Sequence, residues 1–348
     1  MAGSAQLRVR AAIVKGLFAL PERVQRFLVG KPVRLDGQEL AIEAQLLLLV
    51  MKLSGAKLLY PSLTRSRIAM DAGRQVVGGA VPDRVRTSEV RIPGAGEDIP
   101  ATLFRPSGIA APSALLIFYH GGGFVLGSRE SHHSAAAFLA DRADVAVLLP
   151  EYRLAPEYPF PAAAEDALST FAYAVEHAAE LSIDPRRIAV GGDSAGGNLA
   201  AVVAQQTTRA GGPAPVFQLL LYPVVDATAR RRSRELFGDD FFLTDKDMTR
   251  MLDHYARPES DRADVRMSPL LAEDLSGLPP AYLAACGFDP LRDEGEAYAK
   301  RLADFGVPTT LDKRSDLIHG YANYLGAGTY FAKALDDAAD ALRAGLGS

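Results

Sequence analysis

The sequence lacks several features that whole classes of protein need. It contains one cysteine in 348 residues, so no internal disulfide can form, and the apolar segment around Cys286 predicts a core residue in a reducing compartment. Its six histidines form no cluster with cysteine at the spacing of metal ligands. No apolar run is long enough to cross a bilayer, and the net charge of −4 offers no basic surplus for nucleic acid. We therefore expect a cytoplasmic protein without a metal, a cofactor or a nucleic-acid partner.

The amino-terminal segment has only part of the pattern of a secretory signal. Residues 7–20 combine basic side chains with an apolar stretch, but Lys15 interrupts that stretch and no convincing cleavage site of small residues follows. A helical arm is the favoured interpretation. Residues 41–53 form a second, strongly apolar helix pattern, which is too short for a membrane span and predicts packing over another surface.

Strand-like and helix-like patterns alternate through the rest of the chain. The expected strands are residues 84–92, 99–104, 114–119, 145–149, 187–191, 217–221, 281–285 and 309–313. Helices between the later strands force these strands to be parallel. With 48% hydrophobic residues, the chain can bury one large core. The predicted class is α/β, with a mostly parallel central sheet of about eight strands flanked by helices.

A serine lies at a predicted strand-to-helix turn. Residues 192–197 read GDSAGG and follow the strand 187–191, which is the context that a nucleophile elbow requires. So sharp a turn leaves no room for side chains at Gly192 and Gly196. Ser194 would then project its hydroxyl from the sheet. The amide of Ala195, at the start of the next helix, is the first candidate donor to an oxyanion.

A second glycine-rich segment, residues 120–124 (HGGGF), follows the predicted strand 114–119. A loop at this place could be an ordinary turn or a phosphate cradle, but no GxxxxGK[ST] or strand-linked GxGxxG pattern accompanies it. As the partner of the elbow it would supply further oxyanion donors, with Gly121 and Gly122 as the candidates. The two motifs together, each after a strand, predict a serine hydrolase.

The base is found by elimination among the histidines. In this class of enzyme it follows the nucleophile in the sequence, and only His254 and His319 come after Ser194. His254 lies in a helix-like segment far from any strand end, which favours a surface residue. His319 lies in a loop after the last predicted strand and is therefore the candidate base.

The acid is expected just beyond a strand end. Asp289 is the first carboxylate after the strand 281–285. An aspartate followed by a proline, here Pro290, is also a common N-cap at the start of a helix, so the catalytic and capping roles compete for the same carboxylate oxygens. Asp293 and Glu294 fall about a turn further on and are expected to be solvated. Asp289 is the preferred acid.

These segments carry a family resemblance. Together with residues 152–162 (YRLAPEYPFPA), 289–294 (DPLRDE) and 319–321 (HGY), they resemble the bacterial hormone-sensitive-lipase-like esterases of the α/β-hydrolase fold. The similarity extends over roughly residues 85 to 345, and the aspartate before the serine is typical of the GDSAGG branch. One small departure is Tyr321, where phenylalanine is frequent in the family.

The resemblance implies a triad and an oxyanion hole. The triad would consist of Ser194, Asp289 and His319, and the oxyanion hole of the amides of Gly121, Gly122 and Ala195. It also implies that Glu157 belongs to a supporting hydrogen-bond network and that His120 orients the glycine loop.

Two segments are expected to form a helical cap over a catalytic domain of residues 81–348. One is the amino-terminal region, residues 1–80, and the other is an insertion at about residues 227–268. Five apolar side chains of the insertion could line an acyl pocket. Apolar residues at helical spacing, however, more often belong to the ordinary hydrophobic core. They are Phe241, Phe242, Met248, Met251 and Tyr255.

The predicted reaction is two-step hydrolysis of a small-molecule acyl ester through an acyl-enzyme on Ser194. The resemblance favours short- to medium-chain acyl groups, with an optimum at about four to six carbons as each fitting methylene adds affinity. An amidase or an acyltransferase could use the same triad. An interfacial, membrane-associated lipase is less favoured, but residues 7–28 could expose an apolar face to a membrane and leave this function open. A ligand-binding homologue without activity is disfavoured because such a protein would normally have lost a triad member. A homodimer is also left open.

Overall fold

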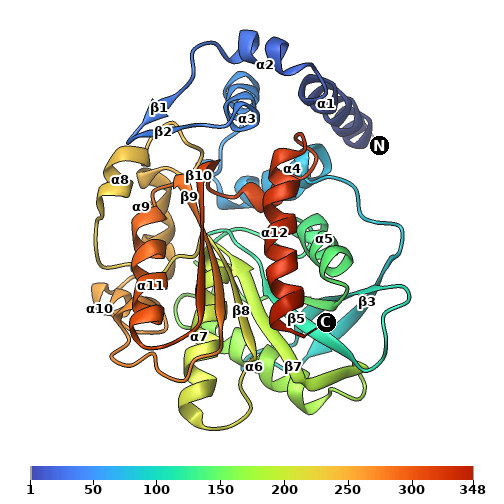
Figure 1. Ribbon diagram of the computed structural model, residues 1–348, viewed down its shortest axis with the longest axis vertical. Helices are drawn as coiled ribbons and strands as arrows, with labels where there is room; N and C mark the ends of the chain where they lie inside the picture. The colour runs from blue at the N-terminus through green and yellow to red at the C-terminus, as the bar shows by residue number, and fades with distance from the viewer. Residues whose placement is uncertain (1, 348) are drawn as a thin grey trace.

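A mixed eight-stranded sheet forms the centre of the computed structural model, which describes residues 2–347 (Figure 1). The strands are β3 (Val85–Ile92), β4 (Ile99–Pro106), β5 (Ser113–Tyr119), β6 (Ala146–Pro150), β7 (Ile183–Asp193), β8 (Phe217–Leu221), β9 (Ala281–Phe288) and β10 (Thr309–Ile318). Their spatial order is β10-β9-β8-β7-β5-β6-β4-β3. β4 is antiparallel to β3 and β6, whereas the other neighbours are parallel. The predicted α/β class and all eight predicted strands are confirmed.

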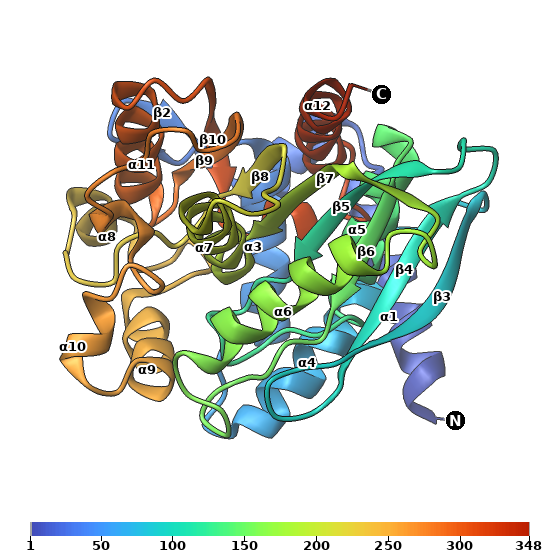
Figure 2. The same cartoon turned by 90° about the horizontal axis from the view of Figure 1, so that it is seen from below.

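Helices cover both faces of this sheet (Figure 2). Along β5, Leu115 and Ile117 belong to one hydrophobic core and Leu116 and Phe118 to another, since successive side chains of a strand point to opposite faces. The first core is closed by α6 (Ala162–Glu176), α7 (Ala195–Ala210) and α11 (Arg292–Asp304), and the second by α5 (His133–Ala143) and α12 (Tyr330–Gly345). Burial on both sides explains why β5 is apolar from residue 114 to its end.

The amino-terminal region contains four helices, α1 (Ala2–Phe18), α2 (Glu22–Val29), α3 (Ile42–Ser54) and α4 (Leu63–Val77). Figure 1 shows α1, α2 and α3 grouped at one end of the molecule. The sequence patterns do not predict the small ribbon between α2 and α3, formed by β1 (Arg34–Leu35) and β2 (Gln38–Glu39). Its two-residue turn consists of Asp36 and Gly37, with φ of 54° and 76°, the left-handed backbone that hairpin turns of this kind need.

The segment predicted as an insertion is also largely helical. It contains α8 (Arg232–Phe237), α9 (Asp245–Tyr255) and the single turn α10 (Glu259–Arg262). Short 3₁₀ turns follow at Pro269–Leu271 (η1) and Tyr321–Asn323 (η2). Cys286 is fully buried in β9, as predicted. Within residues 2–347 no helix has the length and apolarity to cross a membrane.

Candidate active site

The predicted elbow is a strained turn between β7 and α7. Ser194 has φ 55° and ψ −116°, a backbone conformation that residues other than glycine rarely adopt. A Cβ atom at Gly196 would lie 1.8 Å from the carbonyl oxygen of Tyr119, and one at Gly192 would lie 2.4 Å from the carbonyl carbon of Gly196. The surrounding backbone therefore admits only glycine at both positions, as the sequence analysis predicts.

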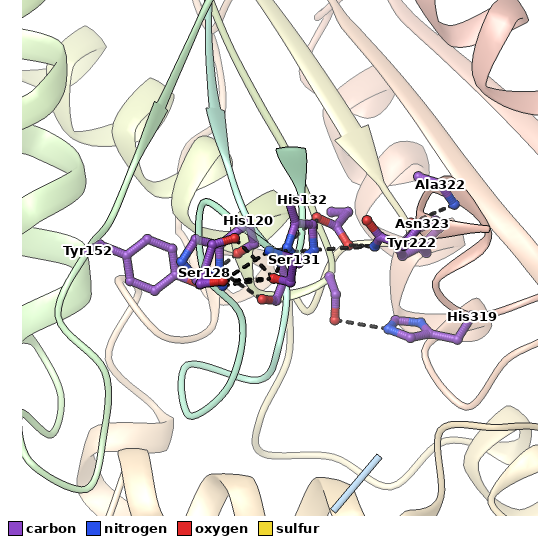
Figure 3. A network of polar contacts seen from close by, with 12 residues as sticks. His120, Ser128, Ser131, His132, Tyr152, Tyr222, His319, Ala322 and Asn323 are labelled. Atoms are coloured by element: carbon purple, nitrogen blue, oxygen red, sulfur yellow. Dashed lines mark hydrogen bonds and ion pairs between the residues drawn. The ribbon is translucent and has the colours of Figure 1, made fainter. Parts of the chain in front are cut away.

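The structure brings Ser194, His319 and Asp289 together from three different strand ends. Nε2 of His319 lies 3.0 Å from Oγ of Ser194, and Nδ1 of His319 lies 2.7 Å from Oδ2 of Asp289. Ser194 follows β7, Asp289 follows β9 and His319 follows β10, so all three lie beyond the carboxyl ends of parallel strands. All three residues are buried. In Figure 3 the dashed line from the imidazole of His319 marks its contact with Oγ of Ser194.

The two roles expected to compete at Asp289 are divided between its oxygens. Oδ2 faces the imidazole, while Oδ1 accepts a hydrogen bond of 2.8 Å from the amide of Leu291 in the turn that leads into α11. The turn thereby fixes the carboxylate in the orientation that the imidazole needs. A hydroxyl, an imidazole and a carboxylate in this order can transfer a proton from the serine and stabilise the resulting imidazolium.

The other histidine after the serine lies elsewhere. His254 belongs to α9 and makes no hydrogen bond to Ser194 among the contacts of the described residues. It lies near the carboxylate of Glu157, whose pKa it helps to lower.

The glycine loop differs from the prediction in one respect. The amide of Gly121 donates a hydrogen bond of 2.8 Å to Oδ1 of Asp193, so this donor is engaged with a buried carboxylate. Gly122 and Gly123, in contrast, line the cavity beside Ser194. Both have positive φ, 123° and 61°, and a Cβ atom at Gly122 would lie 2.3 Å from the carbonyl oxygen of Leu126. We therefore revise the candidate donors of this loop from Gly121 and Gly122 to Gly122 and Gly123.

His120 contacts the glycine loop directly. Its Nδ1 lies 2.9 Å from the carbonyl oxygen of Gly121, and its ring stacks on Tyr152 at 4.1 Å between centroids. The hydroxyl of Tyr152 donates to the carbonyl oxygen of His120 at 2.6 Å. Burial, assisted by the nearby His132, lowers the pKa of His120 to about 3. The ring is therefore neutral, with its proton on Nδ1 to donate to the loop.

Glu157 is bound by an arginine that the sequence analysis does not single out. Arg67 of α4 contacts both oxygens of Glu157, at 2.9 and 2.8 Å. It also donates to the carbonyl oxygens of Val125 and Ala155 at 2.9 and 2.8 Å, so it ties the amino-terminal region to the segment after the glycine loop. The hydrogen bonds from Arg67 lower the pKa of Glu157. An arginine in a polar helix has no local signal that could have revealed this role.

A cavity of about 210 Å³ opens beside the serine. One part of its wall comes from α3, α4 and the segment between them, and another part comes from α9 and the loop before it. Among the lining residues are Met51, Leu58, Met70, Val77, Phe242, Leu243, Met248, Met251 and Leu252. Of the five pocket candidates in the insertion, Phe242, Met248 and Met251 line this cavity. Tyr255 is buried and stacks on Phe124 at 4.1 Å, so it is a core residue, whereas Phe241 is half-buried and packs on Phe288.

Glu294 was expected to be solvated, and that expectation is wrong. The residue is 4% exposed and lines the cavity, and its carboxyl group accepts a hydrogen bond of 2.9 Å from the amide of Val225. The turn of α11 that carries it faces the start of the insertion rather than solvent. Burial raises the pKa of Glu294 to about 8.

The described part of the chain holds no group of three or more His, Cys, Asp or Glu side chains arranged for a metal ion. The polar groups near Ser194 instead form a hydrogen-bond network around His319, Asn323, His132 and His120 (Figure 3).

Comparison with known proteins gives consistent matches. A family model described as the α/β-hydrolase fold matches residues 116–323. The carboxylic ester hydrolase LipN of Mycobacterium tuberculosis is 44% identical over 343 residues, which cover 96% of this chain and 90% of LipN. The ethyl acetate hydrolase of Pseudomonas putida is 39% identical over 65% of this chain and 72% of that enzyme. An ester hydrolase from the metagenome of Lake Arreo, solved with a bipyridine phosphonate derivative, has a TM-score of 0.84 and 38% identity and covers 89% of this chain and 100% of its own.

Proposed function

This chain belongs to the hormone-sensitive-lipase-like group of α/β-hydrolases and is a carboxylic ester hydrolase, and from that premise we propose that Ser194, His319 and Asp289 act as its catalytic triad. The observation that carries this proposal is the continuous hydrogen-bonded series from Oγ of Ser194 through the imidazole to the carboxylate, at 3.0 and 2.7 Å.

In the first step Ser194 attacks the ester carbonyl while Nε2 of His319 takes its proton. Asp289 keeps the other ring nitrogen protonated and stabilises the imidazolium. The imidazolium then protonates the leaving alcohol, and an acyl-enzyme remains. Water repeats the sequence on the acyl-enzyme and releases the acid, so no cofactor is needed.

The amides of Gly122, Gly123 and Ala195 would receive the oxyanion of the tetrahedral intermediate. Gly122 and Gly123 line the cavity next to Ser194, and Ala195 begins α7, where unpaired amides and the helix dipole favour negative charge. Each such donor typically contributes about 3 kcal/mol to transition-state stabilisation.

The substrates that this cavity favours are esters of short to medium acyl groups. Each methylene of the acyl chain that is buried against the apolar walls adds about 0.8 kcal/mol of binding free energy until the space is filled. The cavity volume of about 210 Å³ limits the number of methylenes that fit. We propose an optimum at about four to six acyl carbons. One relative that acts on a small ester by name is the ethyl acetate hydrolase.

A fluorophosphonate probe followed by peptide mapping tests the nucleophile. Ser194 should be the labelled residue, and Ser194→Ala should lose both labelling and hydrolysis while its Tm stays close to that of the wild-type protein, because only one hydroxyl is removed. Labelling at another serine, or a variant with more than about one hundredth of the activity, would contradict the proposal. Rates against graded acyl esters, an amide and an alcohol acceptor separate esterase from amidase and acyltransferase activity.

One observation favours interfacial lipase activity as a second candidate. Large apolar side chains are exposed on the amino-terminal helices, including Phe27 at 85% and Leu53 at 79%. Residues 1–80 also carry twelve Lys and Arg against five Asp and Glu, which suits an anionic lipid surface. A preference for long-chain triglyceride emulsions over soluble short-chain esters would favour this function over the first.

A further inference from the structure

Behind Ser194 lies a second buried imidazole–carboxylate pair, formed by His132 and Asp193. We propose that His132 and Asp193 are positioning residues that hold the glycine loop ready for the oxyanion, and that two serines connect them to Asp71 on α4. This inference rests on the proposed function, because it assumes that the glycine loop receives the oxyanion.

Asp193 joins three segments of the site. It is the last residue of β7 and precedes Ser194. Its Oδ1 accepts a hydrogen bond of 2.8 Å from the amide of Gly121. Its Oδ2 accepts one of 3.2 Å from Nδ2 of Asn323. Asn323 ends η2, the turn that begins two residues after His319. One carboxylate therefore sets the elbow, the glycine loop and the histidine loop relative to one another.

Asp193 is 2% exposed and is held as an anion. Burial alone would raise its pKa, but His132, the amide of Gly121 and His319 oppose burial and together lower it. A buried carboxylate is stabilised as an anion by the hydrogen bonds that it accepts. The amide of Gly121 and Nδ2 of Asn323 donate to the carboxylate of Asp193, and the ring of His132 lies beside it.

The ring of His132 is fully buried and is held at both nitrogens. Nε2 lies 3.3 Å from Oδ1 of Asp193, 3.3 Å from the amide nitrogen of Gly121 and 3.2 Å from Nδ2 of Asn323. Nδ1 lies 2.8 Å from Oγ of Ser131. Because that hydroxyl donates its own hydrogen to the carbonyl oxygen of Ser128 at 3.0 Å, it must accept from His132, and Nδ1 carries a proton.

The two serines, which Figure 3 shows beside His132, extend the network to α4. Oγ of Ser128 accepts the amide of Ser131 at 3.0 Å and donates to the carboxylate of Asp71 on α4. The neighbouring residues Met70 and Arg74 line the cavity. Helix α4, which lines part of the cavity, is thus linked to the amide of Gly121 through Asp71, Ser128, Ser131, His132 and Asp193.

The kinetic consequence differs from that of a purely structural network. Misplacing the oxyanion loop weakens interactions made in the transition state and leaves substrate binding largely intact. A shift of about 1 Å in such a group commonly costs about 100-fold in rate. Loss of the pair should therefore lower kcat and the affinity for a tetrahedral analogue in parallel, with little change in KM.

The test compares Asp193→Ala, Asp193→Asn and His132→Ala with His133→Ala as the matched control. The ring of His133 packs on Phe104 at 4.7 Å and takes no part in the network. Asp193→Ala and His132→Ala should lower kcat about 100-fold, and should weaken a trifluoromethyl ketone inhibitor by a similar factor. Asp193→Asn keeps an oxygen for the amide of Gly121 and should recover part of both losses, while His133→Ala should resemble the wild-type protein. Ser128→Ala removes both the bond to Asp71 on α4 and the acceptor of the Ser131 amide, and should lower kcat on the order of fivefold.

Ser194→Ala and the wild-type protein are measured in parallel, with the Tm of every variant. If Ser194→Ala abolishes activity while Asp193→Asn and His132→Ala keep kcat and ketone affinity within about threefold, the positioning role is overturned and the triad stands. If Ser194→Ala remains active, the proposed function itself fails. Should Asp193→Ala not fold, Asp193→Asn and Ser128→Ala still decide the question by the same two readouts.

Discussion

At the scale of single residues, the site contains one carboxylate that contacts the proposed base and another that contacts the glycine loop. Asp289 contacts His319 at 2.7 Å, and Asp193 contacts the amide of Gly121 at 2.8 Å. Each carboxylate accepts one further hydrogen bond. The backbone amide of Leu291 donates to Asp289, and the side-chain amide of Asn323 donates to Asp193. Rigid, buried acceptors of this kind need no reorganisation when the reaction begins.

His319→Ala and Asp289→Asn should reduce activity to different extents. Loss of the base should lower kcat by about 10⁶, whereas the amide leaves the imidazole in place, favours the wrong tautomer and should cost about 10⁴. Steady-state kinetics with a chromogenic butyrate ester measures both. His254→Ala is the control and should keep full activity. Activity retained in His319→Ala but lost in His254→Ala would overturn the choice of base.

Glu294 should make stability depend on pH. Its pKa is about 8 in the folded protein against an ordinary value of 4.5, so between these values the folded protein holds a proton that the unfolded chain has lost. This contribution is complete below pH 4.5 and disappears as the pH rises through 8, with a total on the order of a few kcal/mol. Urea denaturation of the wild-type protein and Glu294→Gln at several pH values checks this. Equal pH slopes for the two proteins would show that Glu294 is not the source.

The residues that sequence reasoning could and could not find differ in a physical way. Ser194, Asp289 and His319 each follow a strand, and chain order together with the position of strand ends was enough to propose them. The bond between Gly121 and Asp193 joins residues 72 positions apart, and no local pattern reveals which amide a carboxylate engages. The burial of Glu294 likewise depends on which segment covers its helix turn.

At the scale of secondary-structure elements, Arg67 is one of the side chains of α4, with Asp71 and Arg74, that bind the rest of the molecule through hydrogen bonds or ion pairs. Arg67 donates to the carbonyl oxygens of Val125 and Ala155 and to both oxygens of Glu157. Its ion pair with Glu157 is the more exposed part of this contact, since the side chain of Glu157 is 55% exposed.

Arg67→Met should therefore destabilise the protein more than Glu157→Gln. The first change leaves two partly buried carbonyl groups without a donor and should cost about 1–3 kcal/mol, whereas exposed ion pairs usually contribute less than about 1 kcal/mol. The free energy of unfolding in urea is the measurement. A similar loss in both variants would indicate that the ion pair, and not the carbonyl contacts, holds α4.

Long elements were easier to predict than short ones for a related reason. Apart from Ser113 in β5 and Gln218 in β8, these two strands are apolar because both of their faces are buried, and their bounds agree with the predicted strands to within one residue. β1 and β2 contain two residues each. A ribbon so short has no periodicity to detect, and the Asp36-Gly37 pair alone indicates only a turn.

At the scale of the whole molecule, the cavity is shaped by two segments that are far apart in the sequence. Met70 belongs to α4 and Met248 to α9, and both line the space beside Ser194. The boundaries predicted for the two cap segments remain an interpretation. Their lining side chains nevertheless give that interpretation a measurable consequence, because each should limit the acyl chain that fits.

Met70→Ala and Met248→Ala should shift the acyl-chain optimum to longer chains. The wild-type protein is expected to peak at about four to six carbons, and each truncated side chain vacates space for further methylenes, each worth about 0.8 kcal/mol when buried. The measurement is kcat/KM across p-nitrophenyl esters from acetate to decanoate. Met267→Ala is the matched control, because Met267 is fully buried but does not line the cavity; its stability should fall while its chain-length profile stays unchanged. If Met267→Ala moves the optimum as far as the two lining variants do, loosened packing and not cavity size sets the preference.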